Sequence, residues 1–357
     1  MKEISIIGTV GIPAKYGGFE TLTEYLTKNL HDSYELTVFC SGKNYTEQLE
    51  IYNGAKLKYI NLHANGVQSI PYDIISIFKS LSFADTLLIL GVSGCIVLPF
   101  VRLFSKKRIV VNIDGLEWKR DKWGKGAKWF LKFSEKIAVK YADVVVSDNK
   151  VIQEYVFSEY GVKSELIAYG ADHVIKKVLS NKIQKKYPFL SDKYAFKVCR
   201  IEPENNVHLI LDAFSEYSEL SIVMIGNWKN SEYGKELKEK YNSFKNIFLL
   251  DPIYDQNILN QIRSNCCVYM HGHSAGGTNP SLVEAMYLGL PIFAFGVEYN
   301  RETTQHKAKY FNDKDELLEL LKNINDDELK IVADDMERVA KENYTWKKIS
   351  EQYAELF

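Results

Sequence analysis

The sequence has no long hydrophobic run. Its longest apolar stretch covers residues 95–104 and is interrupted by Pro99 and Arg102. A membrane-spanning helix needs about 20 apolar residues, so this stretch is too short to cross a bilayer. A secretion signal is not expected either, because residues 1–3 lead directly into the strand-like residues 4–7. The sequence therefore predicts a soluble, cytoplasmic protein that can still touch a membrane from one side.

Cysteines are few and form no pair with metal or redox spacing. They make an odd set without a C-x-x-C motif, and each lies in an apolar run. They are Cys40, Cys95, Cys199, Cys266 and Cys267. Because disulfides persist in oxidising compartments, we expect buried, reduced thiols and a reducing compartment.

The chain also lacks a strong net charge. Its 45 Lys and Arg residues nearly balance 46 Asp and Glu residues, which gives a formal net charge of -1. The field of the whole molecule favours no particular partner, so any basic surface must be local. With 357 residues, of which 46% are hydrophobic, the chain has the length and composition of two α/β domains.

Short apolar runs alternate with helix-period segments, which is typical of parallel sheets covered by helices. In the first half, strands are predicted at residues 4–7, 36–39, 57–60, 86–90, 109–113 and 144–146. The pattern restarts in the second half, with strands predicted at residues 196–199, 222–225, 247–250, 268–270 and 291–295. We therefore expect an α/β fold of two doubly wound, Rossmann-like domains, residues 1–172 and 173–340. The carboxyl ends of both sheets should face each other across a ligand-binding cleft.

A glycine-rich loop follows the first predicted strand and opens a helix. It contains Gly8, Gly11, Gly17 and Gly18. Such a loop offers free backbone N–H groups and the positive end of a helix dipole to an anion. The G-x-G-x-x-G spacing of dinucleotide-binding proteins is absent, and the second strand ends without an Asp or Glu, so a nicotinamide or flavin enzyme is disfavoured. Glycines that only turn the chain are the simpler alternative.

Two strand ends in the second half carry residues suited to a nucleotide. Arg200 follows the strand at residues 196–199 and can hold a phosphate in bidentate fashion. The strand at residues 268–270 leads into a second glycine-rich loop and a helix. Glu284 lies one turn inside that helix, where its carboxylate can accept hydrogen bonds from a ribose diol.

The loop before this helix has residues that favour a helix start. Thr278 or Asn279 can cap the helix, and Pro280 suits its first turn. His271 and His273 lack a third ligand at a workable spacing, so no zinc site is predicted.

These motifs resemble a known family. The Arg200 loop and the Glu284 helix are similar to those of the retaining GT-B glycosyltransferases of the sucrose-synthase and glycogen-synthase type. Residues 8–21, 114–120 and 200–206 resemble the branch of bacterial rhamnosyltransferases that assemble capsule and cell-wall polysaccharides. The likeness extends over nearly the whole chain. It implies a GT-B fold, with residues 341–357 as a terminal helix that crosses back to the N-terminal domain.

The resemblance implies a role for each motif. Arg200 is expected to hold the donor pyrophosphate and Glu284 the nucleotide ribose, and Asp114 is a candidate for a polar residue beside the sugar or acceptor. The other donor-binding residues are expected in the two loops and at one strand end, where residues 251–253 would read the base. They are Gly17, Gly18, Ile253, Gly277, Thr278, Asn279, Pro280, Ser281 and Leu282. Backbone N–H groups at Gly17, Gly18 and 279–282 would contact the phosphates and sugar.

The sequence departs from the wider family at three places. Relatives carry a lysine after the glutamate of the Arg loop, whereas this chain has Asn205. They often have an acidic residue eight positions before Glu284, where this chain has Gly276. The first-domain histidine near the donor sugar is replaced around Asp114. We hypothesise that Arg301 supplies the positive charge that the missing lysine would have given.

The resemblance implies transfer of a sugar from a nucleoside diphosphate sugar to a glycan or lipid-pyrophosphate-linked acceptor. No cofactor and no metal are expected, because helix ends and basic side chains neutralise the leaving diphosphate. The branch suggests L-rhamnose from deoxythymidine diphosphate rhamnose, and another hexose donor such as a UDP-sugar is an alternative. A nucleotide-sugar epimerase and a non-catalytic nucleotide-sugar-binding or scaffold protein are further alternatives.

One segment combines basic and aromatic residues. Residues 118–140 contain eight Lys and Arg, two acidic residues and three of the five tryptophans. The lysines recur at helical spacing, and Phe130, Phe133 and Ile137 should face the core on the opposite side. A solvated lysine face is one interpretation. An anionic membrane surface or a lipid-pyrophosphate acceptor is the other, and no motif of a nucleic-acid reader is present. The residues of this predicted face are Trp123, Lys125, Lys128, Trp129 and Lys132.

Overall fold

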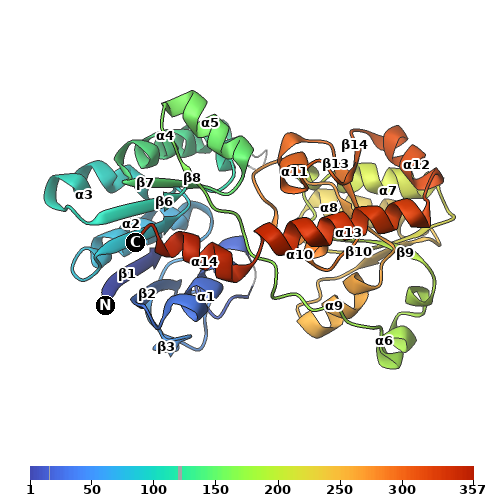
Figure 1. Cartoon of the computed structure of the whole chain (residues 1–357), viewed down its shortest axis with the longest axis horizontal. Coiled ribbons are helices and arrows are strands. Elements are labelled where there is room, and N and C mark those ends of the chain that lie inside the picture. The colour runs from blue at the N-terminus through green and yellow to red at the C-terminus, as the bar shows by residue number, and fades with distance from the viewer. Residues whose placement is uncertain (16, 120–122) are drawn as a thin grey trace. The chain divides into compact units, whose positions relative to one another are not determined.

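A computed structural model describes residues 1–15, 17–119 and 123–357 of the chain. The chain divides into two compact units (Figure 1). Unit 1 comprises Met1–Gly170 and Trp346–Phe357, and unit 2 comprises Ala171–Thr345. Four residues of the segments singled out in the sequence, Tyr16 and residues 120–122, lie outside the described residues.

Unit 1 is built on an eight-stranded sheet with the order β3-β4-β2-β1-β5-β6-β7-β8. Every neighbouring pair is parallel except β3 and β4. The strands are β1 (Lys2–Ile7), β2 (Tyr34–Ser41), β3 (Ile51–Tyr52), β4 (Ala55–Ile60), β5 (Thr86–Leu90), β6 (Arg108–Asn112), β7 (Val144–Ser147) and β8 (Glu165–Leu166). The long helices are α1 (Gly18–Leu30), α2 (Ser69–Ser80), α3 (Leu98–Phe104), α4 (Lys125–Tyr141) and α5 (Lys150–Tyr160).

Unit 2 has a six-stranded, all-parallel sheet with the order β11-β10-β9-β12-β13-β14. Its strands are β9 (Tyr194–Val198), β10 (Ser221–Ile225), β11 (Ile247–Leu250), β12 (Val268–His271), β13 (Ile292–Phe295) and β14 (Lys309–Phe311). Its helices are α6 (Asn181–Lys186), α7 (Val207–Glu216), α8 (Glu232–Tyr241), α9 (Gln256–Ser264), α10 (Pro280–Tyr287), α11 (Glu298–Thr303), α12 (Lys314–Lys322) and α13 (Asp326–Asn343).

The predicted α/β class with two Rossmann-like sheets is confirmed, and each of the eleven predicted strands has a counterpart in the sheets. The sequence analysis missed β3, β8 and β14, which have two or three residues each. A run that short carries no period, so it cannot be recognised by alternation.

The C-terminal segment divides between the two units. Helix α13 continues to Asn343 in unit 2, and α14 (Trp346–Ala354) belongs to unit 1. The Trp346 ring stacks on Tyr25 of α1 with the centroids 4.6 Å apart. Tyr353 is fully buried and its hydroxyl accepts a hydrogen bond from Asn112 at 2.8 Å. The last helix is therefore part of the unit 1 core.

Among the described residues, no helix is both long and apolar enough to cross a membrane.

Candidate functional site

The candidate site in unit 2 lies where the strand order reverses. Strands β9 and β12 are neighbours in the sheet, and their crossovers lead to opposite sides of it. In doubly wound sheets the loops after two such strands leave a crevice at the carboxyl edge, where ligands bind. Here these loops are residues 199–206, the Arg200 loop, and residues 272–279, the glycine loop.

The two loops are joined by side-chain hydrogen bonds. The Asn205 amide donates to the Arg200 carbonyl oxygen at 2.9 Å, and its Oδ1 lies 3.0 Å from His273 Nδ1. The Asn206 amide donates to the Gly272 carbonyl oxygen at 2.9 Å. A Cβ on Gly272 would collide with the Asn205 carbonyl oxygen, so this close approach requires glycine. Asn205 therefore fixes the Arg200 backbone against the glycine loop.

The Arg200 side chain is available to an anion. It is 42% exposed, and its Nε lies 3.8 Å from Glu202 Oε2, which is too long for a hydrogen bond. Since no closer partner holds this guanidinium within residues 1–15, 17–119 and 123–357, it can turn toward a phosphate without breaking a buried ion pair.

The N-terminus of α10 follows the predicted capping pattern. Asn279 Oδ1 accepts the Ser281 N–H at 3.0 Å, and Pro280 occupies the first turn. The Leu282 N–H donates to the Asn279 carbonyl oxygen at 3.0 Å. Pro280 has no N–H to donate. Of the other backbone N–H groups predicted to contact phosphate at residues 279–282, those of Ser281 and Leu282 already have a partner within the protein.

Backbone donors without such partners lie just before the helix. Among the described residues, the amides of Gly276 and Gly277 have no hydrogen-bond partner. Gly276 has a φ of 101°, a conformation that a residue with a Cβ rarely adopts. In this loop, these two amides are therefore the donors that remain available to an anion.

Glu284 is held as an ionised carboxylate by two residues that the sequence analysis missed. Arg263 Nη1 of α9 lies 2.5 Å from Glu284 Oε2, and His173 Nε2 lies 3.0 Å from Oε1. Burial opposes ionisation, but the charge of Arg263 and the His173 bond lower the pKa of Glu284 to about 2. Each carboxylate oxygen keeps a second lone pair that can accept a hydrogen bond from a hydroxyl group.

The sequence carries no clear signal for Arg263, because most of its neighbours in α9 are polar. In the structure its side chain is 3% exposed and lies between the buried Ile262 and Ser264. A buried basic residue needs an acidic partner, but this burial is visible only in the fold. His173 follows the last residues of unit 1 in the chain and has no signal either.

Arg301 lies on α11, after β13, the next strand along from β12. Its Nε donates to the Gly296 carbonyl oxygen at 3.1 Å, and its guanidinium lies 4.2 Å from the centre of the Tyr310 ring. The neighbouring Asn300 is buried and donates to the His273 carbonyl oxygen at 2.8 Å, so α11 is attached to the glycine loop. The hypothesis that Arg301 reaches the diphosphate stays a prediction.

The predicted base-reading segment follows β11. Ile253 is half-buried in the loop between β11 and α9. Strand β11 is the edge strand on the β9 side of the sheet. The segment therefore lies at the same carboxyl edge as the Arg200 loop, two strands away.

In unit 1, the glycine-rich loop after β1 carries its own carboxylate. Gly17 precedes α1 with a φ of 129°. Glu20, in the first turn, accepts hydrogen bonds from the Val10 N–H at 2.7 Å and the Thr9 hydroxyl at 3.1 Å. Burial raises the pKa of Glu20 although these bonds oppose the change. A phosphate that approached Gly17 and Gly18 would therefore lie close to the Glu20 carboxyl group.

Asp114 lies at the carboxyl edge of the same sheet. It follows β6 with a φ of 62°, and its N–H donates to Asn112 Oδ1 at 2.9 Å. Burial raises the pKa of the Tyr169 hydroxyl, and the charges of Asp114 and Asp148 raise it further. Asp148, which the sequence analysis missed, is 3% exposed and follows β7. The carboxyl edge of unit 1 is thus acidic.

The basic segment forms α4, but the side of this helix that faces solvent differs from the prediction. Trp129 is 69% exposed and Phe133 is 39% exposed, and their rings are stacked. The expectation that Phe133 faces the core is therefore wrong. Glu135 is 2% exposed on the inner side, so the helix is turned to satisfy that carboxylate.

The Lys132 side chain points inward, against aromatic rings of unit 1, and not outward with the other lysines of the predicted face. Its ammonium lies 4.6 Å from the centre of the Trp118 ring and 4.7 Å from that of Tyr155. Glu135 accepts hydrogen bonds from the Tyr155 and Tyr160 hydroxyls at 2.6 Å each. Lys125 remains exposed, whereas Lys128 and Trp123 are half-buried. The structure thus separates Lys132 from the other members of the predicted face.

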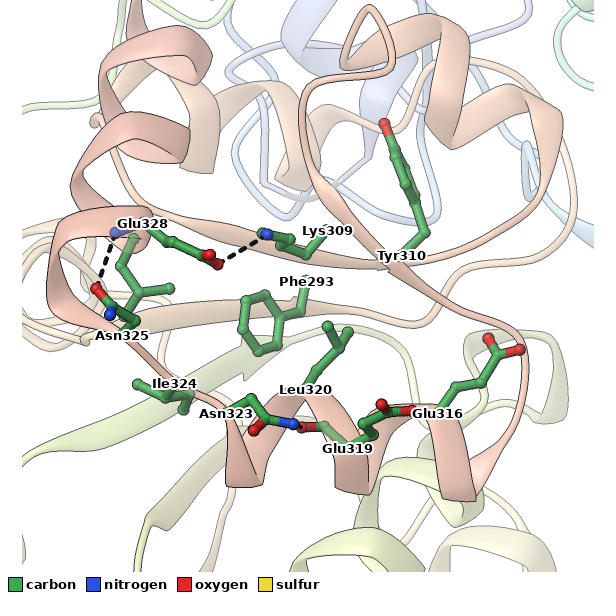
Figure 2. A pocket seen from close by; sticks show the side chains of 11 residues that line it. Phe293, Lys309, Tyr310, Glu316, Glu319, Leu320, Asn323, Ile324, Asn325 and Glu328 are labelled. Atoms are coloured by element: carbon green, nitrogen blue, oxygen red, sulfur yellow. Dashed lines mark hydrogen bonds and ion pairs between the residues drawn. The ribbon is translucent and has the colours of Figure 1, made fainter.

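A cavity of about 420 Å³ in unit 2 lies apart from these loops. It is bounded by α12, β14 and the start of α13 (Figure 2). Glu328 forms an ion pair with Lys309 at 2.9 Å across it, and Glu316 and Glu319 add further acidic groups. Excess carboxylate makes this cavity unsuited to a diphosphate.

Among the described residues, one group could hold a metal ion, namely Glu298, Glu302 and His306 at the surface around α11. His271 and His273 do not belong to it.

The comparisons with known proteins agree with this fold. Residues 180–346 match the family model described as glycosyl transferases group 1, and residues 1–172 match a domain of unknown function, DUF1972. A curated relative, described as an uncharacterized glycosyltransferase of Methanocaldococcus jannaschii, is 23% identical over 405 residues. The alignment covers 100% of this chain and 99% of that protein.

Solved structures show the same architecture. Sucrose-phosphate synthase from Thermosynechococcus elongatus superposes with a TM-score of 0.82 at 14% identity, over 100% of this chain and 98% of that one. HepE of Anabaena in complex with UDP-glucose gives a TM-score of 0.77 at 16% identity, over 99% and 98%.

Fold and comparisons together define a glycosyltransferase with the GT-B fold. Residues 180–346, which match the model described as glycosyl transferases group 1, carry both Arg200 and Glu284.

Proposed function

We propose that the chain transfers a sugar from a nucleoside diphosphate sugar to a glycan acceptor. The observation that carries this proposal is the pair of joined loops in unit 2. They place an available Arg200 guanidinium at the same sheet edge as the ionised Glu284, together with two glycine amides that have no partner in the described part of the chain. A diphosphate matches the cation and the amides, and a ribose diol matches the carboxylate.

The proposed reaction forms one bond and breaks one. An acceptor hydroxyl attacks the anomeric carbon while the bond from that carbon to the diphosphate oxygen breaks. Attack from the side of the leaving group retains the anomeric configuration, and the departing phosphate oxygen takes the hydroxyl proton. Positive groups act on the diphosphate, where most negative charge develops. Arg200 contributes this stabilisation in the proposal, and no metal is needed.

Arg301 is proposed as the second positive group. It is supported by the position of α11, which Asn300 attaches to the glycine loop. Arg301→Ala should weaken donor binding and turnover together. Arg338→Ala, an exposed arginine on α13, is the matched control. Unchanged donor affinity and turnover in Arg301→Ala would refute this role.

The finer proposal is L-rhamnose transfer from deoxythymidine diphosphate rhamnose to a lipid-linked glycan of a bacterial surface polysaccharide, at the cytoplasmic face of the membrane. It is supported by the resemblance of residues 8–21, 114–120 and 200–206. A UDP-sugar is the second candidate donor, because the similar HepE binds UDP-glucose.

A panel of nucleotide sugars tests both levels. Binding is measured by calorimetry, and transfer to a lipid-linked saccharide is followed by mass spectrometry, with Arg200→Ala as the negative control. Turnover of one donor only in the presence of acceptor supports the transferase. Turnover without acceptor would indicate an epimerase, and binding without any turnover would indicate a non-catalytic protein.

A further inference from the structure

Helix α3 of unit 1 exposes most of the surface of three large apolar side chains. Phe100 is 62% exposed, Leu103 73% and Phe104 88%. They recur at spacings of three and one, so they lie on one side of the helix. Val101 and Leu98 are buried on the other side, which fixes the orientation of α3 on the sheet.

Helix α3 packs against α4 (Figure 1). Helix α4 exposes the stacked rings of Trp129 and Phe133. Arg102 attaches the two helices, because its Nε donates to the Tyr141 carbonyl oxygen at 2.9 Å and its Nη2 pairs with Asp143 at 2.7 Å. We call the exposed apolar residues of α3, together with the stacked Trp129 and Phe133 of α4, the α3–α4 face.

The two helices that carry the α3–α4 face, together with the residues that follow α3, are rich in cations and have no exposed acid. Residues 98–108 contain four Lys and Arg and no acid. Helix α4 contains five lysines, and its single acid, Glu135, is buried. Since the whole chain has a net charge of -1, this local excess of positive charge is offset by acidic surface elsewhere.

We propose that the α3–α4 face docks unit 1 on an anionic phospholipid bilayer. Phe100, Leu103, Phe104 and Trp129 enter the interface between headgroups and acyl chains, and the lysines of the same segments lie at the lipid phosphates. A second copy of the chain fits this face less well, because a two-fold interface would press two positive surfaces together. The proposal deepens the proposed function, since a lipid-linked acceptor would then be presented at the docked surface.

Vesicle flotation of the full chain tests this docking without any donor sugar. We expect flotation with vesicles containing phosphatidylglycerol, none with phosphatidylcholine alone, and a decrease as salt is raised. Leu103→Ser/Phe104→Ser should lower the bound fraction about tenfold. Ile331→Ser/Val178→Ser is the matched control, because both side chains are exposed apolar residues of unit 2. Transfer to a soluble acceptor should be equal in all variants, so failure of docking is separable from failure of the transferase.

Two further measurements decide between occupants of the face. The tryptophan emission should shift to the blue with phosphatidylglycerol vesicles, and Trp129→Phe should remove most of that shift. Lys136→Glu/Lys140→Glu should abolish the preference for the anionic lipid. Docking is refuted if the wild type does not float, or if Leu103→Ser/Phe104→Ser floats as well as the wild type. It is also refuted if that variant converts a dimer into a monomer in solution, since a second copy then covers the face.

Discussion

At the scale of single residues, Glu284 combines a structural and a binding role. Its partner Arg263 is 3% exposed, so this ion pair is shielded from water. Removing one member of a buried pair leaves the other charge without compensation, which costs far more than the loss of a surface pair. Stability and donor affinity should therefore respond together at this position.

Glu284→Gln should lower the free energy of unfolding by roughly 2–4 kcal/mol, because Arg263 loses its counter-charge. It should also weaken nucleotide binding. Denaturant unfolding and calorimetry measure the two effects. Glu319→Gln, an exposed residue of α12, should change neither. A variant as stable as the wild type would show that the Arg263 pair is not needed.

The same pair predicts acid sensitivity. The pKa of Glu284 is lowered from about 4.5 to about 2, so its contribution is complete above pH 4.5 and is lost as the pH falls toward 2. Glu284→Gln should therefore show a flatter loss of stability between pH 4.5 and 2 than the wild type. Equal slopes in this range would contradict an ionised Glu284.

At the scale of elements, the start of α10 offers a way to separate folding from binding. Asn279 caps the helix through Ser281 and lies next to the glycine loop. Asp caps a helix as well as Asn does. An added carboxylate, however, repels a diphosphate bound nearby.

Asn279→Asp should therefore keep the melting temperature and lose donor affinity by at least tenfold. Asn279→Ala should lower stability by about 1 kcal/mol through the lost cap. Thermal melts and calorimetry compare the two variants. If Asn279→Asp bound donor like the wild type, the phosphates would not lie near this helix end.

Helix α4 illustrates how one buried acid changes the faces of a helix. The spacing of the five lysines predicts that they all lie on one side of the helix. Lys132 instead pairs with Glu135 and lies over the rings of Trp118 and Tyr155. The lysines of α4 are therefore not equivalent. Lys136 is exposed, and it has no ion pair or ring contact with any residue that the structure describes.

Lys132→Met should lower the free energy of unfolding by roughly 1–2 kcal/mol, because Glu135 and the rings lose a cation. Lys136→Met should leave it unchanged. Denaturant unfolding of both variants gives the comparison. Equal stabilities would mean that the contacts of Lys132 with the rings contribute nothing.

At the scale of the whole molecule, the C-terminal segment is part of unit 1 although it follows unit 2 in the chain. Trp346, Ile349, Tyr353 and Phe357 are all buried there. Burying each such side chain contributes about 2 kcal/mol.

Truncation after Thr345 should therefore destabilise unit 1 by several kcal/mol and leave unit 2 unaffected. Scanning calorimetry should show one transition moving to lower temperature and the other staying in place. Nucleotide binding by unit 2 is the control that its fold survives. Two unchanged transitions would contradict the assignment of α14 to unit 1.

The sequence by itself determined the two-sheet α/β fold, because apolar runs of four to six residues and helical periodicity are local properties. It also indicated the loops that carry Arg200 and Glu284, since glycines and helix caps are read from neighbouring residues. Only the tertiary structure decided that Asn205 joins these loops and that Arg263 and His173 hold Glu284. It also turned Lys132 inward and left the apolar side of α3 exposed. These outcomes depend on contacts between residues far apart in the chain, and burial assigns each side chain a partner that local spacing cannot specify.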